Sequence, residues 1–110
     1  MSYREYLHHI LDETEFILQK TSQLKKDIFL NDEVLKRAVV RSLEIIGEAT
    51  KKLPDDIKSK YPQIAWRAIA GTRDKLIHDY FGIDYDIVWD IVSNEIHDLK
   101  SIVEKILRSG

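Results

Sequence analysis

Apolar residues recur at alternating intervals of three and four along nearly the whole chain, which is the spacing of helices that pack along one face. The first such segment runs from about Tyr3 to Lys26. Its stripe consists of Tyr3, Leu7, Ile10, Thr14, Ile17, Thr21, Leu24 and Ile28. A strand would need alternation every second residue, so this period predicts a helical fold. Only 4 glycines and 2 prolines in 110 residues agree with that prediction.

Three further segments carry the same pattern, over residues 31–53, 66–80 and 84–107. Asn31 or Asp32 is a plausible N-cap for the first of them, because short polar side chains accept hydrogen bonds from the first turn. Pro54 ends that helix, since proline cannot continue it. Gly82 ends the next one.

Four amphipathic helices joined by short links predict an all-α, antiparallel up-and-down four-helix bundle that forms a single domain over residues 1–110. The connector 54–64 has room for one short additional helix. A core of this size is small. The wide apolar face of the last helix therefore suggests that a second copy covers part of it.

Composition excludes several classes of protein. The chain has no cysteine, which excludes a disulfide scaffold, a thiolate zinc site and a cysteine nucleophile. The charged N-terminus MSYREYLHHI is unlike a signal peptide, and no apolar run approaches the roughly 20 residues of a membrane span. We therefore expect a cytoplasmic protein without a membrane anchor.

Positive charge is concentrated in one segment. The net charge of the chain is −2, but residues 51–78 contain 7 basic and 3 acidic side chains. A local positive field attracts phosphate groups. A solvated surface of mixed charge would give the same count, so charge alone does not decide between these interpretations.

Arg73 lies inside the apolar stripe of the segment 66–80. At 100° per residue, Asp74 lies about 100° from Arg73, His78 about 140° and Tyr80 about −20° if the helix extends that far. Asp74 and His78 would be i,i+4 neighbours, so that the carboxylate could hold one imidazole nitrogen. These polar groups would border one concave patch, provided that another surface closes over it.

An unpaired buried arginine would cost several kcal/mol, so Arg73 needs a partner. A structural ion pair with Glu48 of the second helix is one possibility, and a place at a homodimer interface is another. The third is an anion site in which the guanidinium meets a phosphate. His78 favours the third, because a structural ion pair has no need of a group that titrates near neutrality. The residues alone leave structural and catalytic interpretations equally open.

Phosphodiester cleavage is the chemistry that would use this set. An RNA 2′-hydroxyl can attack its own phosphorus if a group moves protons and a cation stabilises the transition state. His78 could move the protons, Arg73 could hold two phosphate oxygens, and Asp74 could fix the imidazole tautomer. No metal is needed for this. The sequence predicts none, since it has neither a helical HxxxH pattern nor a carboxylate cluster, and the adjacent His8 and His9 point about 100° apart.

The segment RDKLIHDY has the R-x4-H-x-Y form of the HEPN ribonuclease motif. Together with IIGEA, AWRAIAG and FGID..VW around it, the chain resembles the HepT-like (DUF86) branch of the HEPN superfamily from about Leu35 to the C-terminus. Family members often have asparagine where this chain has Asp74. This difference leaves the proposed chemistry intact and adds a negative charge near the phosphate site.

The resemblance implies a metal-independent endoribonuclease that acts as the toxin of a type II toxin–antitoxin pair. It implies an RNA substrate, a homodimer in which two motifs face one cleft, and an MNT-type minimal nucleotidyltransferase as antitoxin. Arg73 and His78 carry over as catalytic residues and Asp74 as a supporting residue. Glu48 maps to a recurrent family position, and its supporting role as partner of Arg73 is inferred from the residues rather than from the resemblance. RNA cleavage needs no cofactor, but the antitoxin would transfer AMP from ATP to Tyr80. The alternative is a non-catalytic helical dimer that binds a nucleotide or a nucleotidyltransferase through the same patch.

Overall fold

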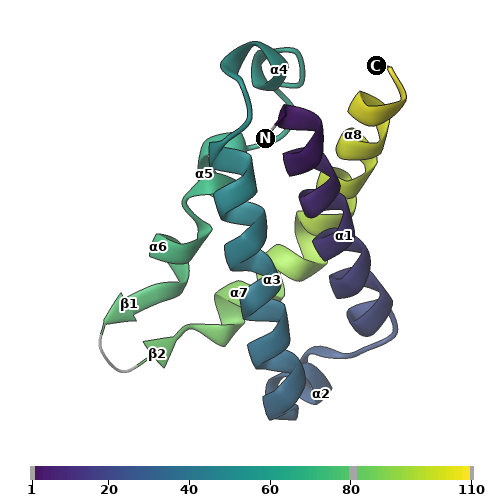
Figure 1. The fold of residues 1–110 in the computed structure, drawn as a ribbon. Helices are drawn as coiled ribbons and strands as arrows, with labels where there is room; N and C mark the ends of the chain where they lie inside the picture. The colour runs from purple at the N-terminus through teal and green to yellow at the C-terminus, as the bar shows by residue number, and fades with distance from the viewer. Residues whose placement is uncertain (1, 80–81, 110) are drawn as a thin grey trace.

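Two long helices, α1 (Tyr3–Thr21) and α3 (Glu33–Lys51), lie side by side and run in opposite directions at the centre of the fold (Figure 1). The computed structural model describes residues 2–79 and 82–109, with only the backbone for Arg73, Lys75 and Ile77–Asp79. The C-terminal helix packs on α1, and two short helices pack on the other side of α3. The all-α, antiparallel up-and-down bundle predicted from the sequence is confirmed.

The shorter elements connect and flank these two helices (Figure 1). They are α2 (Lys26–Asn31), α4 (Asp55–Ser59), α5 (Trp66–Ala70), α6 (Thr72–Leu76), β1 (Ile77–Asp79), β2 (Gly82–Ile83), α7 (Tyr85–Asn94) and α8 (Ile96–Arg108). The additional helix predicted in the connector is α4, which begins directly after Pro54.

Several predicted helix ends are confirmed by hydrogen bonds. Asp32 is the N-cap of α3, and its side chain accepts from the backbone N–H of Leu35 at 2.9 Å. Asp84 caps α7 in the same way and accepts from the N–H groups of Asp86 and Ile87 at 3.0 and 3.3 Å. Caps are readable from sequence because they depend on one side chain and the turn that follows it.

The first predicted helix is too long. It ends at Thr21 rather than near Lys26, and the chain then forms the separate helix α2. The predicted stripe placed Ile28 inward, but Ile28 is 53% exposed and its neighbour Phe29 is fully buried. The Phe29 ring packs on Trp89 of α7 with 5.2 Å between centroids. Burial of this large aromatic side chain explains why α2 adopts a direction of its own.

The third predicted helix, 66–80, is also wrong. It breaks at Gly71 into α5 and α6, and α6 ends at Leu76, directly before β1. At the break, the Thr72 hydroxyl donates to the Ile69 carbonyl at 2.6 Å. A threonine side chain that bonds to a backbone carbonyl three or four residues earlier competes with regular helix and often bends it.

The fourth predicted helix bends at Glu95 and is divided into α7 and α8. The helical bond from the Glu95 N–H to the Ile91 carbonyl persists at 2.9 Å, so this is a kink rather than a gap. The Asn94 side chain donates to the Asp90 carbonyl at 3.0 Å. Insertion of a side chain into the backbone ladder is a known cause of helix kinks.

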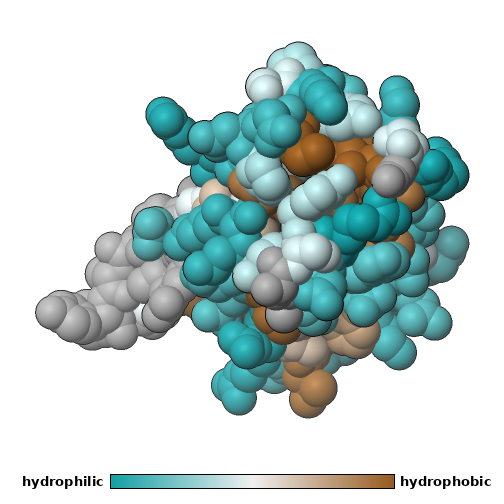
Figure 2. All heavy atoms as spheres, turned by 45° about the horizontal axis from the view of Figure 1, so that its top comes forward, coloured by the Kyte–Doolittle hydropathy of each residue, from teal (hydrophilic) through white to brown (hydrophobic). Residues whose placement is uncertain are grey.

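The core lies where α1, α3, α7 and α8 meet. Its fully buried centre includes Leu7, Ile10, Ile17, Val39, Val88, Leu99 and Val103. The face shown in Figure 2 is mostly hydrophilic, with hydrophobic colour confined to small areas. No helix within the described residues is long and apolar enough to cross a membrane.

Candidate active site

The R-x4-H-x-Y motif lies where helix changes to strand, at the edge of the bundle. Arg73 is the second residue of α6 and His78 is the middle residue of β1. Tyr80 lies outside the described residues. The arginine and the histidine therefore belong to two different elements, and their separation depends on how each element is held.

The predicted helical arrangement of these residues is wrong. Because α6 ends at Leu76, Asp74 and His78 are not i,i+4 neighbours on one helix, and the azimuths calculated for His78 and Tyr80 do not apply. Asp74 lies on α6 with its side chain exposed. A contact between Asp74 and the His78 imidazole stays a prediction.

Gly47 of α3 brings α5, and with it the start of the motif, close to the bundle. A Cβ atom at this position would lie 3.3 Å from the carbonyl oxygen of Ile69 and 3.4 Å from that of Ala70. Both neighbours are backbone atoms, which cannot move aside by rotating a side chain. The glycine in the IIGEA segment therefore allows close approach of the two helices just before Thr72 begins α6.

We expect Gly47→Val to lower both stability and RNA cleavage. Overpacking of this kind costs about 1–3 kcal/mol, which corresponds to a fall in Tm of about 4–8 °C for each kcal/mol in a small domain. Displacement of α5 should also move α6. Thermal unfolding followed by circular dichroism measures the first effect, and an RNA cleavage assay below Tm measures the second.

Gly71→Ala is the matched control for this substitution. Its Cβ would make only ordinary contacts, 3.4 Å from the Arg67 carbonyl oxygen and 3.9 Å from that of Ala68. Its effect on the free energy of unfolding should stay within about 0.5 kcal/mol. If Gly47→Val is as stable and as active as the wild type, the proposed role of this close approach is wrong.

A short hairpin carries His78. β1 and β2 pair antiparallel, with Ile77 opposite Ile83 and Asp79 opposite Gly82. The Asp84 N–H donates to the Leu76 carbonyl at 3.0 Å and closes the base of the hairpin. Gly82 has a φ of 131°, a conformation that side-chain-bearing residues rarely adopt, so glycine is required at this position.

Two lysines that the sequence patterns did not reveal as important connect the bundle to the start of α7, the helix that directly follows this hairpin. Lys36 of α3 is buried, and its ammonium lies 3.1 Å from Glu33 Oε1 and 4.4 Å from the centre of the Tyr85 ring. Lys26 of α2 pairs with Asp86 at 3.0 Å. The hydrogen bond that Lys26 donates to the Asp86 carboxylate raises the pKa of Lys26, with smaller contributions from the charge of Asp86 and those of neighbouring carboxylates.

The position of Lys36 could have given a signal. It precedes Val39 and Val40 by three and four residues, and both valines are buried, so it lies on the inward face of α3. A lysine on such a face needs a partner, and an aromatic ring with a carboxylate provides one. Tyr85 directly follows the helix cap Asp84, so this contact holds the first turn of α7.

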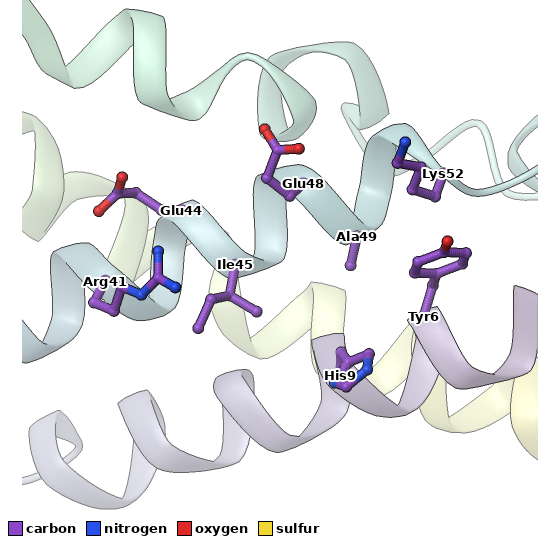
Figure 3. A pocket seen from close by; sticks show the side chains of 8 residues that line it. All are labelled: Tyr6, His9, Arg41, Glu44, Ile45, Glu48, Ala49 and Lys52. Atoms are coloured by element: carbon purple, nitrogen blue, oxygen red, sulfur yellow. The ribbon is translucent and has the colours of Figure 1, made fainter. Parts of the chain in front are cut away.

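Glu48, the expected partner of Arg73, is exposed on α3 and pairs with Lys51, with 3.5 Å between Oε1 and Nζ. Figure 3 shows its carboxylate pointing away from α1. Both α5 and α6 pack against α3. The Arg73–Glu48 pair stays a prediction, since the Arg73 side chain is not among those described.

Metal ligands do not gather among the side chains that the structure describes: no three His, Asp or Glu groups lie together there. His8 and His9 are exposed on α1. His97 on α8 is also exposed, with Nδ1 3.9 Å from Asp98 Oδ1.

The chain is similar to known proteins over most of its length. A model of the family "Ribonuclease HepT-like" matches residues 10–106. A protein of Caldanaerobacter subterraneus subsp. tengcongensis named "Putative RNase" is 49% identical over 105 residues, which cover 96% of this chain and 94% of the relative.

Two archaeal proteins are similar to the same extent. A Methanocaldococcus jannaschii protein named "Putative RNase" is 50% identical over 94% of this chain and 86% of its own length. A Thermococcus cleftensis protein named "Probable ribonuclease HepT" is 44% identical over 96% of both chains. No solved structure matches the chain significantly.

Proposed function

The chain belongs to the ribonuclease HepT-like family, and we propose that it is an endoribonuclease that cleaves RNA without a metal ion through Arg73 and His78. This family membership confirms the HepT-like resemblance inferred from the residues. The observation that carries the proposal is the complete R-x4-H-x-Y segment within the matched region. The anchored positions of α6 and the hairpin support it, because catalysis needs groups held in fixed relative positions.

In the proposed reaction the 2′-oxygen attacks the adjacent phosphorus, a new O2′–P bond forms and the P–O5′ bond breaks. His78 takes the 2′-hydroxyl proton, and a protonated imidazole returns one to the leaving 5′-oxygen. Arg73 binds the non-bridging oxygens, on which negative charge develops. The products are a 2′,3′-cyclic phosphate and a 5′-hydroxyl. If two motifs share one cleft, the two histidines can divide the roles of base and acid.

Incubation of the purified protein with RNA in the presence of EDTA tests this function. We expect cleavage to persist in EDTA and to leave 2′,3′-cyclic phosphate ends, detected by their resistance to phosphatase until acid opens the ring. Loss of cleavage in EDTA would contradict the metal-independent mechanism. Binding of RNA or a nucleotide without any cleavage would favour the non-catalytic alternative.

The biological role that we propose is that of the toxin in a HEPN–MNT toxin–antitoxin pair, with a minimal nucleotidyltransferase as antitoxin. The support for this role is family membership together with Tyr80 in the motif. Co-expression of the two proteins followed by affinity purification of one would test the partnership.

We expect the protein to form a homodimer through the surface of α5–α6 and α7–α8, so that two motifs face one cleft. The reason is that the motif lies at the edge of a small bundle and needs a second surface to exclude water from its phosphate site. Sedimentation equilibrium at micromolar concentration should give twice the 12.9 kDa mass of the chain. A strictly monomeric protein that still cleaves RNA would contradict the shared cleft.

A further inference from the structure

A hollow of about 290 Å³ opens between α1 and α3, on the other flank of α3 from α5 and α6 (Figure 3). Ile45 and Ala49 point into it from α3, and Tyr6 and His9 face it from α1. Its volume is close to the lower end of small-molecule sites, which is the size expected for one ligand unit rather than a long segment of chain.

The inner surface of this hollow is suited to a flat ring. Ile45 and Ala49 supply an apolar floor, and Tyr6 is a partly buried aromatic residue at one end. Stacking on an aromatic side chain is how proteins hold unpaired bases, and every base offers such a face. Tyr6 therefore supplies the hollow with a surface on which a base can stack.

Cationic groups stand at both ends of the hollow. Arg41 lies at one end and Lys52 at the other, and both are exposed. Among the side chains that the structure describes, the ion pairs of α3 use other residues, since Glu33 pairs with Lys36 and Arg37, and Glu48 pairs with Lys51. The carboxylates of Glu44 and Glu48 also border the hollow, but Figure 3 shows both pointing away from α1. An apolar floor with a cation at each end complements a base with phosphates on both sides.

We propose that this hollow is a subsite for one nucleotide of single-stranded RNA, with the base stacked on Tyr6 and the flanking phosphates bound by Arg41 and Lys52. The proposal rests on the proposed ribonuclease function. α3 connects the two sites, because Ile45 faces the hollow while Gly47 contacts α5 just before the motif. A helix is about 10–12 Å wide with its side chains, so the subsite would hold a nucleotide close in sequence to the cleaved bond.

The test is the affinity of the whole protein for a fluorescein-labelled 2′-O-methyl tetranucleotide, measured by fluorescence anisotropy. The methyl group blocks the attacking oxygen, so the wild-type protein can be used without cleavage. Tyr6→Leu should raise the Kd about 5- to 150-fold, the range found when base stacking is removed. Tyr6→Phe keeps the ring and should stay within about twofold of the wild type.

Salt dependence separates the charge contact from the stacking contact. Arg41→Gln should weaken binding and reduce the slope of log K against log salt by about 0.7, the value for one phosphate contact on a single strand. Tyr6→Leu should leave that slope unchanged. Arg37→Gln is the matched control, because Arg37 is an exposed arginine one turn earlier that does not line the hollow.

Unchanged affinity in both Tyr6→Leu and Arg41→Gln would overturn the subsite. So would conversion of a dimer into a monomer by Tyr6→Leu at the same concentration, which would make this face an interface between two copies. Cleavage of unmodified RNA by the wild type, measured in parallel, separates the two proposals. Cleavage without dependence of binding on Tyr6 refutes only the subsite, whereas Tyr6-dependent binding without cleavage refutes only the ribonuclease.

Discussion

Replacing His78 with alanine is expected to lower the rate of RNA cleavage by about 10²–10⁴-fold, the usual contribution of a positioned proton-transfer group. Arg73→Ala should cost about 10²–10³-fold, because it removes a cation from the developing charge of the transition state. The two groups act on one step, so the double variant should be little slower than the worse single variant. Initial rates on a defined RNA measure all three.

Two substitutions elsewhere provide the controls. His8→Ala removes an exposed histidine of α1, and Arg37→Ala removes an exposed arginine of α3, both outside the surface expected to form the dimer. Each should retain cleavage within about threefold and unfold within about 0.5 kcal/mol of the wild type, as surface changes usually do. If His78→Ala retains full activity in a preparation shown to be free of contaminating ribonuclease, the proposed mechanism is wrong.

Transfer of AMP to Tyr80 is expected to reduce cleavage to the level of His78→Ala. Tyr80 follows His78 by two residues, between the last residue of β1 and the first of β2. An AMP group on its phenol oxygen would add a phosphate charge that competes with RNA for Arg73, and a nucleoside that blocks access. The transfer forms a bond from the phenol oxygen to the α-phosphorus of ATP and releases pyrophosphate.

The measurement is incubation with the cognate nucleotidyltransferase, ATP and Mg²⁺, followed by peptide mass spectrometry and a cleavage assay. Tyr80→Phe serves as the control, since it keeps the ring, removes the acceptor oxygen and should remain active after incubation. Modification only at other residues, or inactivation of Tyr80→Phe by AMP transfer, would exclude Tyr80 as the switch.

The sequence predicted the long elements well because their stability depends on repeated contacts along one face. The stripe of α3 and its cap Asp32 are read from periodicity and one side chain, and both are confirmed. The same periodicity predicts a single helix after Trp66, and this prediction is wrong. α5 and α6 have only five residues each, too short to be stable alone, so packing against α3 and pairing of β1 with β2 decide their ends. The spacing of apolar residues along the chain carries no information on such contacts.

In the candidate site, too, the local features could be predicted from the sequence and the tertiary contacts could not. Arg73 and His78 were identified by a local spacing, which survives any error about the element that carries it. The arrangement of Arg73 and His78 in space could not be predicted from this spacing. It depends on the contacts that Gly47 and Lys36 make with residues 20 to 50 positions later in the chain. A glycine that permits close approach looks from the sequence like any other helix glycine. The role of Gly47 becomes clear only from the structure, in which the carbonyl oxygens of Ile69 and Ala70 lie opposite it.

The change from helix to strand between Arg73 and His78 makes their separation a property of the tertiary structure. α6 packs against α3. The hairpin leads into α7, whose first turn is contacted by Lys36 and Lys26. A synthetic peptide of residues 66–94 would contain every letter of the motif yet lack both supports. Such a peptide should be inert toward RNA, and transplanting the eight-residue motif into another helix should transfer no activity.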